Sequence, residues 1–144
     1  MAKIVIDKVE GLLLSMEEIA KIPDEVQMEM IDAGAEILKN GIKRNAEIML
    51  RGPYYKGDVA RSVKKKEPSK SGGKVTQTIT FDGEVRDKYH KKGTRAGEIA
   101  FINEYGKKGQ PARPFIAKAI VDNNDRIADA EAKVLDEYYK SKNL

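Results

Sequence analysis

Apolar residues recur at helical spacing in two long segments of the chain. The first segment runs from Pro23 to Leu50 and stops before Gly52-Pro53, and the second runs from Pro114 to Tyr138. Proline is typical of a first helical turn, because the N–H that it lacks has no partner there. The pattern predicts two long amphipathic helices, and each needs a sheet, another helix or a neighbouring subunit to cover its apolar face.

Two glycines interrupt the first predicted helix on one side. Gly34 and Gly41 are seven positions apart, which places them on the same face. We expect them to let another backbone approach closely rather than to form a hinge.

Strict alternation marks the clearest strand, residues 74–81. Val75, Gln77, Ile79 and Phe81 fall on one side, whereas Lys74 and three threonines fall on the other. A strand with one buried face and one solvent-exposed face is typical of an antiparallel sheet.

Weaker signals predict the partners of this strand. Residues 3–7 form a short β-branched run. Residues 57–63 are interpreted as a turn that enters a strand, and 64–66 continue it. Asp82-Gly83 is typical of a hairpin turn, so residues 84–89 are expected to pair back.

The remaining segments predict short helices and loops. Apolar spacing favours helices over 12–19 and 98–105, while 67–73 and 88–97 have the composition of mobile loops. The expected fold is therefore α+β: one domain over residues 1–144, in which a small antiparallel β-sheet packs against two long α-helices, with short helices added.

Composition excludes several kinds of chemistry. The chain has 144 residues with no cysteine and one histidine, His90, so a thiolate metal site, an iron–sulfur cluster and a multi-histidine site cannot be built within it. The chain contains pairs of neighbouring acidic residues and several serines, but none of them lies in a sequence motif typical of a catalytic site. We expect no enzyme activity, cofactor or metal. No apolar run is long enough for a membrane span, and no signal-peptide core follows Met1, so the chain is expected to stay where it is made.

Positive charge is concentrated in the middle of the chain. Residues 51–96 hold 13 Lys/Arg and 5 Asp/Glu, a balance of +8, whereas the whole chain carries +4. An acidic protein partner, a solvated edge and nucleic-acid binding all fit this pattern, although aromatic stacking residues for single strands are lacking. The candidate partner-binding residues are Lys64, Lys65, Lys66, Lys88, Lys91, Lys92 and Arg95.

Two short motifs near residue 100 resemble a known signature. Phe101-Ile102-Asn103-Glu104-Tyr105-Gly106 is followed by Gln110-Pro111-Ala112-Arg113-Pro114-Phe115. Together with the segment Gly57–Val63 and the opening strand that leads through Glu10-Gly11-Leu12 into a helix, they resemble the neck or tail-completion proteins of tailed bacteriophages and prophages, a family that includes minor tail and head–tail joining components.

This resemblance implies a structural role in a phage virion. Its members act at the head–tail junction or tail end, which implies self-assembly into a ring, with six subunits expected, between head-closure and tail-tube proteins. DNA would be only the content of the channel, and no membrane is implied. The chain would be assembled in the cytoplasm of a bacterial host and then reside in the virion. The alternative is a nucleic-acid-binding module that uses residues 51–96.

The motif residues are interpreted as a structural joint rather than an active site. Tyr105 and Phe115 would close over the short loop as apolar anchors, and Gly106 would form a left-handed cap. Arg113 would brace helix-end carbonyls, pair with a carboxylate such as Glu104, or cross to a neighbouring subunit. The joint comprises Phe101, Glu104, Tyr105, Gly106, Pro111, Ala112, Arg113, Pro114 and Phe115.

Overall fold

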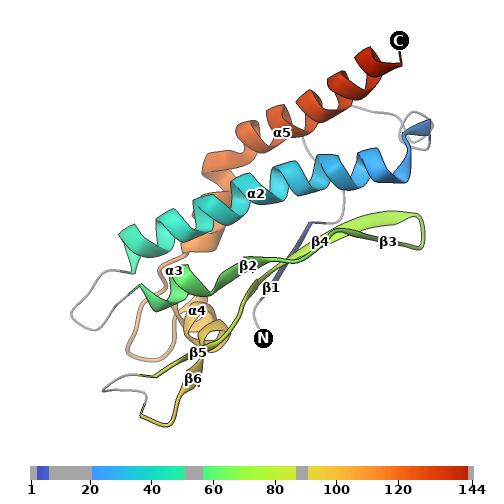
Figure 1. The fold of residues 1–144 in the computed structure, drawn as a ribbon. Helices are drawn as coiled ribbons and strands as arrows, with labels where there is room; N and C mark the ends of the chain where they lie inside the picture. Colours follow the sequence, from blue (N-terminus) through green and yellow to red (C-terminus); the bar gives the residue numbers. More distant parts are fainter. Residues whose placement is uncertain (1–2, 7–20, 51–56, 87–90, 143–144) are drawn as a thin grey trace.

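Two long helices and a small sheet make up most of the structure, a computed structural model that describes residues 3–6, 21–50, 57–86 and 91–142 (Figure 1). This arrangement confirms the predicted α+β class. The elements in chain order are β1 (Lys3–Ile6), α2 (Asp24–Met49), α3 (Asp58–Ser62), β2 (Val63–Lys65), β3 (Ser69–Ser71), β4 (Lys74–Phe81), β5 (Glu84–Val85), β6 (Thr94–Arg95), α4 (Ala96–Tyr105) and α5 (Phe115–Ser141).

Strand β4 is the centre of an antiparallel sheet, with β1 on one side and β2 and β3 on the other. Ile79 lies opposite Ile4 of β1 and Lys65 of β2. The predicted covered face is confirmed, because the side chains at 75, 77, 79 and 81 are all buried. Thr80 of the predicted exposed face is buried as well, and its hydroxyl donates to Oδ1 of Asp82 at 2.9 Å.

Between β2 and β3 the chain carries one extra residue. The N–H of Lys66 donates to the carbonyl of Thr78 at 2.9 Å, and Ser69 pairs with Thr76, so two residues, 67 and 68, face the single position 77. This is the geometry of a β-bulge. Residue 68 is a proline, which has no N–H to lose from the ladder.

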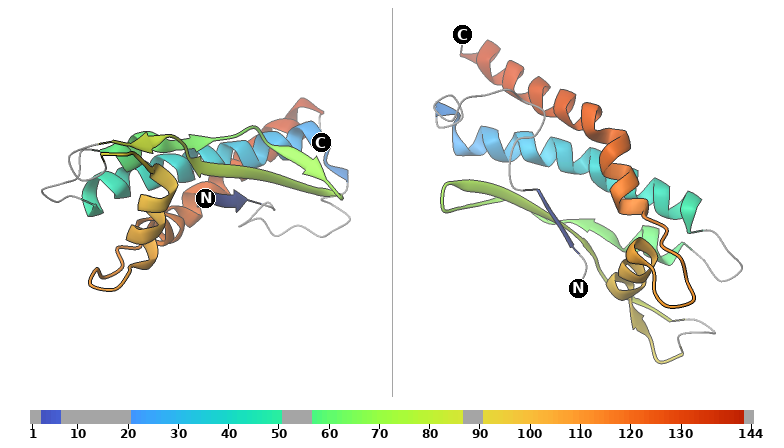
Figure 2. Two further views of the ribbon diagram at one scale, coloured as in Figure 1. Left: turned by 90° about the horizontal axis from the view of Figure 1, so that it is seen from below. Right: turned by 180° about the vertical axis from the view of Figure 1, so that it is seen from behind.

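The elements form three layers, with α2 between the sheet and α5 (Figures 1 and 2). The main core includes Ile42, Ile79, Phe81 and Phe115, all at most 2 % exposed. The rings of Phe81 and Phe115 meet edge to face with centroids 6.0 Å apart, which ties the end of the sheet to the start of α5.

The two glycines of α2 lie where α5 packs against it, and they face side chains of α5 rather than the backbone that was expected. A Cβ on Gly41 would stand 2.6 Å from Nδ2 of Asn123, and one on Gly34 would stand 2.9 Å from Oε1 of Glu131. Asn123 and Glu131 are both buried in α5. The missing side chains therefore provide room for two polar groups between the long helices.

Four local predictions were wrong. Residues 58–62 form helix α3 rather than a strand entrance, and the chain enters it through Gly57 with φ of 81°. Residues 69–71 are a strand rather than a loop, because the glycines at 72 and 73, both with positive φ, close a tight hairpin onto β4. Residues 84–85 pair with 94–95 instead of folding back on β4, and α4 begins at residue 96, inside the predicted loop 88–97.

The predicted helix over 12–19 and residues 87–90, with Lys88 and His90, lie outside the described residues.

Candidate interaction surfaces

Glu104 caps the N-terminus of α5 from the last turn of α4. Its Oε2 accepts a hydrogen bond from the N–H of Ile116 at 2.8 Å, and its Oε1 accepts one from the N–H of Ala117 at 3.0 Å. These N–H groups lack partners within the helix, and a carboxylate also suits the positive end of the helix dipole. The side chain is only 8 % exposed, so its charge is used inside the chain.

Gly106 turns the chain sharply away from α4. Its φ of 78° is positive, but its ψ of 175° is extended, so the predicted left-handed cap was wrong in detail. A Cβ here would stand 2.8 Å from the backbone N of Ala112 and 3.0 Å from the carbonyl of Gln110. Glycine is therefore required both by the backbone angle and by the close return of the loop.

A tight turn forms the tip of this loop. Lys107 and Gln110 exchange backbone hydrogen bonds of 3.0 and 2.9 Å, with Lys108 and Gly109 between them. The prolines at 111 and 114 and the alanine at 112 are exposed. They shape the loop without entering the core.

Arg113 fastens the loop to two helices. Its backbone N–H donates to the carbonyl of Asn103 in α4 at 2.6 Å, and its Nη1 donates to the carbonyl of Met49 at the end of α2 at 3.4 Å. The brace to a helix-end carbonyl is therefore the alternative that the structure supports. Asn45 adds a bond from its Nδ2 to the carbonyl of Phe115 at 3.2 Å, a contact that no motif in the sequence indicates.

The aromatic members of the joint face opposite ways. Phe115 is fully buried, as expected of an anchor, but Tyr105 is 69 % exposed and does not close over the loop. Phe101 is 53 % exposed, and its ring lies 4.8 Å from that of Tyr105. Both point away from the buried face of α4, which is formed by small residues and Glu104.

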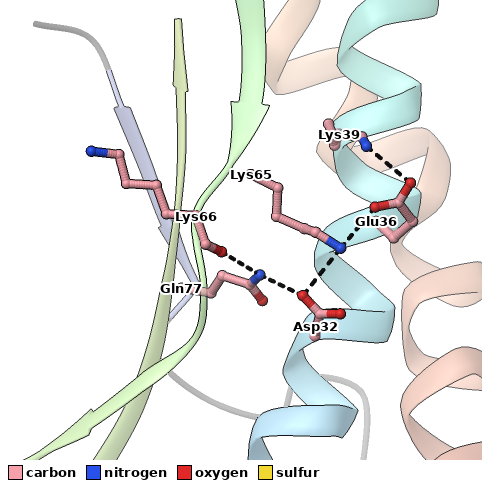
Figure 3. Close-up of polar contacts among 6 residues, drawn as sticks. All are labelled: Asp32, Glu36, Lys39, Lys65, Lys66 and Gln77. Carbon is pink, nitrogen blue, oxygen red and sulfur yellow. Dashed lines mark hydrogen bonds and ion pairs between the residues drawn. The ribbon is translucent and has the colours of Figure 1, made fainter. Parts of the chain in front are cut away.

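The candidate basic residues do not form one surface. Lys64 is exposed, and so is Lys66, whose side chain points away from α2 (Figure 3). Lys65 lies between them on the opposite face, toward α2. Lys91, Lys92 and Arg95 are exposed in and just before β6, which pairs with β5 in a two-stranded sheet separate from that of β2.

Lys65 belongs to an ion-pair network between the sheet and α2 (Figure 3). Its Nζ lies 3.1 Å from Oδ1 of Asp32 and 2.8 Å from Oε2 of Glu36, and Glu36 also pairs with Lys39 at 3.0 Å. The hydrogen bonds from Lys65 and Lys39 lower the pKa of Glu36 to about 2. Burial lowers the pKa of Lys65, but its hydrogen bonds to Glu36 and Asp32 outweigh that effect and raise it overall. The charge of Lys65, one of the candidate partner-binding residues, is therefore paired with carboxylates of α2 within the chain.

Gln77 joins this network to the bulge. Its Nε2 donates to Oδ1 of Asp32 at 2.6 Å and to the carbonyl of Lys66 at 2.7 Å, and the side chain is 1 % exposed. A glutamine at an inward position of β4 therefore holds the irregular edge of the sheet against α2.

A shallow pocket of about 360 Å³ lies between the end of β4 and the start of α4. Phe81, Asp82, Glu84, Arg95 and Glu98 line it, together with two glycines. Within the described ranges, no group of three or more histidine, aspartate or glutamate side chains is arranged to hold a metal ion.

Comparison of the chain with protein-family models, with curated proteins and with solved structures finds no match. Among the helices of the described residues, none is long and apolar enough to cross a membrane.

Proposed function

We propose that this chain is a structural component of a phage or prophage-derived tail. It would act at the head–tail junction or tail end as a neck or tail-completion protein. In this role it assembles into a ring, with six copies expected, and joins head-closure proteins to the tail tube. The proposal assigns it no catalytic activity and no cofactor, and it places the protein in the virion after assembly in the bacterial cytoplasm.

The geometry of the joint is the observation that carries this proposal. The residues that resemble the phage signature are used for connection: Glu104 caps α5, Arg113 braces the end of α2, and Gly106 lets the loop fold back. A carboxylate and a guanidinium that are both engaged with backbone groups are typical of a scaffold rather than of a reactive site. The signature thus supports a rigid subunit whose outer surfaces are left for binding.

Those outer surfaces suit assembly. The large exposed apolar residues among those described are Ile48, Phe101, Tyr105, Ile120 and Val121, which lie on three different helices. A ring needs two different surfaces that fit each other on successive copies, so apolar residues on separate elements favour this mode of contact.

Deleting the gene from a bacterium that releases the corresponding particles tests the proposal. We expect filled heads and free tails to accumulate unjoined, because the connecting ring is missing. A plasmid copy of the chain should restore joined particles, whereas the Gly106→Val variant should not, because a side chain there meets the returning loop. Normal joined particles in the deletion strain would overturn the proposal.

Nucleic-acid binding through residues 51–96 stays an alternative. The structure weakens its basis, because Lys65 pairs with Asp32 and Glu36, and Lys70 pairs with Asp24. Affinity for duplex DNA that falls steeply with salt would favour it, and absence of binding at low ionic strength would remove it.

A further inference from the structure

Two positions of the sequence place an asparagine or aspartate directly before a glycine. Asn40 precedes Gly41, and Asp82 precedes Gly83. At such a pair the backbone nitrogen of the glycine can attack the side-chain carbon Cγ, because glycine has no Cβ to block the approach. The product is a five-membered succinimide ring, so each pair is a candidate site of spontaneous chemical change.

The fold protects the first of these pairs. Asn40 and Gly41 lie well inside α2, where each backbone N–H donates to a carbonyl of the preceding turn. The nitrogen of Gly41 is thus engaged in the helix, and the helical ψ of Asn40 keeps that nitrogen away from Cγ. Although the Asn40 side chain is exposed, ring closure there requires the helix to open locally.

The turn after β4 leaves the second pair open. Asp82, Gly83 and Glu84 are all exposed. Gly83 lies outside helix and strand with φ of 97°, and a Cβ placed on it would meet no atom within 4 Å. Its N–H donates to no backbone acceptor of the described residues. The nitrogen that must attack is therefore neither engaged by backbone nor enclosed by neighbouring atoms.

We propose that Asp82 isomerises spontaneously to isoaspartate in the folded chain, whereas Asn40 stays intact. In an unfolded chain the order is the reverse, because the carboxyl of an aspartate must first take up a proton before it reacts and the amide of an asparagine need not. The fold thus decides which of the two pairs reacts. The proposed function plays no part in this reaction, which requires only the exposed turn and water.

Water is first a product and then a reactant of this change. The Gly83 nitrogen attacks Cγ of the protonated Asp82 carboxyl, and the hydroxyl of that carboxyl leaves as water with the proton of the N–H. A water molecule, which reaches the exposed turn freely, then adds to one of the two ring carbonyl carbons. When the bond from the nitrogen to the backbone carbonyl carbon breaks, the main chain runs through Cβ and Cγ of residue 82.

The modification lengthens the main chain by one methylene group between two fixed points. The N–H of Asp82 donates to the carbonyl of Ser62 at 2.8 Å, and the carbonyl of Gly83 accepts from the N–H of Ala96 at 3.0 Å. These bonds tie the end of β4 to the last residue of α3 and to the first residue of α4. We expect isoaspartate at residue 82 to break the bond to Ala96 and to loosen the start of α4.

A variant with the same dipeptide at both positions isolates the effect of the fold. Asp82→Asn keeps an oxygen that accepts from the Thr80 hydroxyl, and Asn40 of the same molecule is its matched control. Mass spectrometry of digests measures the conversion of amide to acid at each position during storage at neutral pH. We expect residue 82 to react at least about tenfold faster than Asn40 in the folded chain, and the two rates to become similar in urea. Equal rates in the folded chain, or a faster reaction at Asn40, would overturn the proposal.

The unaltered chain provides a second measurement that needs no substitution. Storage in water enriched in heavy oxygen labels each residue whose ring has opened, and chromatography separates the isoaspartate peptide from the aspartate peptide. We expect label and the new isomer at Asp82 of the folded chain while Asn40 keeps its amide, and we expect Asn40 to react first in urea. Loss of the Asn40 amide before label appears at Asp82 of the folded chain, or label at Asp82 in urea alone, would contradict the proposal.

Discussion

At the scale of single residues, charged side chains are used mainly to hold backbone. Glu104 and Arg113 both satisfy helix-end groups that have no partner within their own helix. The sequence identifies Glu104 as a member of a motif and as one possible partner of Arg113, and it leaves three alternatives for the role of Arg113. No local pattern could decide between them, because the end of α2 is more than sixty positions away in the chain.

The cap by Glu104 gives a prediction for stability. Glu104→Ala leaves two N–H groups of α5 without their acceptor, and we expect the free energy of unfolding to fall by about 2 kcal/mol. Glu104→Gln keeps one acceptor oxygen and should cost about half as much. Urea unfolding followed by circular dichroism measures both. Glu98→Ala, an exposed acid of the same helix, is the control, and equal stability of the two alanine variants would contradict the cap.

At the scale of elements, the predictions succeeded where the apolar pattern is long. The helices α2 and α5 and the strand β4 each repeat a burial pattern over eight or more residues, and their sequence signals predict them well. The short elements failed, because one turn of α3 or three residues of β3 hold too little pattern to outweigh composition. Strand β3 consists of two serines and one lysine, and the Gly72-Gly73 turn joins it to β4.

The role of Lys65 also could not be predicted from a local pattern. It belongs to a run of three lysines, which suggests a solvated or partner-binding surface. The alternation of a strand turns the middle lysine inward, and there it meets carboxylates of α2 that the sequence does not place nearby. The ion pairs with α2 thus use one of the charges that the sequence assigned to the candidate partner-binding residues.

The network between the sheet and α2 predicts a dependence of stability on pH. The pKa of Glu36 is about 2 in the folded chain against 4.5 as its ordinary value, so the stabilisation is complete above 4.5 and is lost as the pH falls toward 2. Because the Glu36 side chain is 45 % exposed, solvent screening limits this contribution to about 1 kcal/mol.

We therefore expect Glu36→Gln to be less stable than the unaltered chain by about 1 kcal/mol at neutral pH, and by less at pH values below 4.5. Urea unfolding at the two pH values measures the difference, with Glu29→Gln, an exposed acid on the same helix, as the matched control. A difference that stays constant on acidification would show that the ion pairs with Lys65 and Lys39 do not stabilise the fold.

At the scale of the whole molecule, the interior is closed and the outer surfaces are left for contact. The sheet, α2 and α5 cover one another in three layers, and the joint fixes α4 and its loop to both long helices. What remains exposed is apolar or charged and spread over several elements. This distribution supports the proposal that the chain is a subunit that works by binding other copies and other proteins of an assembly.

Native mass spectrometry of the purified full-length chain, with negative-stain imaging of the same sample, tests this account most directly. Six copies of a 16.1-kDa chain have a mass of about 97 kDa, and we predict a discrete species at this mass, which images as a closed ring. A chain that stays at 16.1 kDa at every concentration, alone and mixed with purified tail tubes, would contradict it.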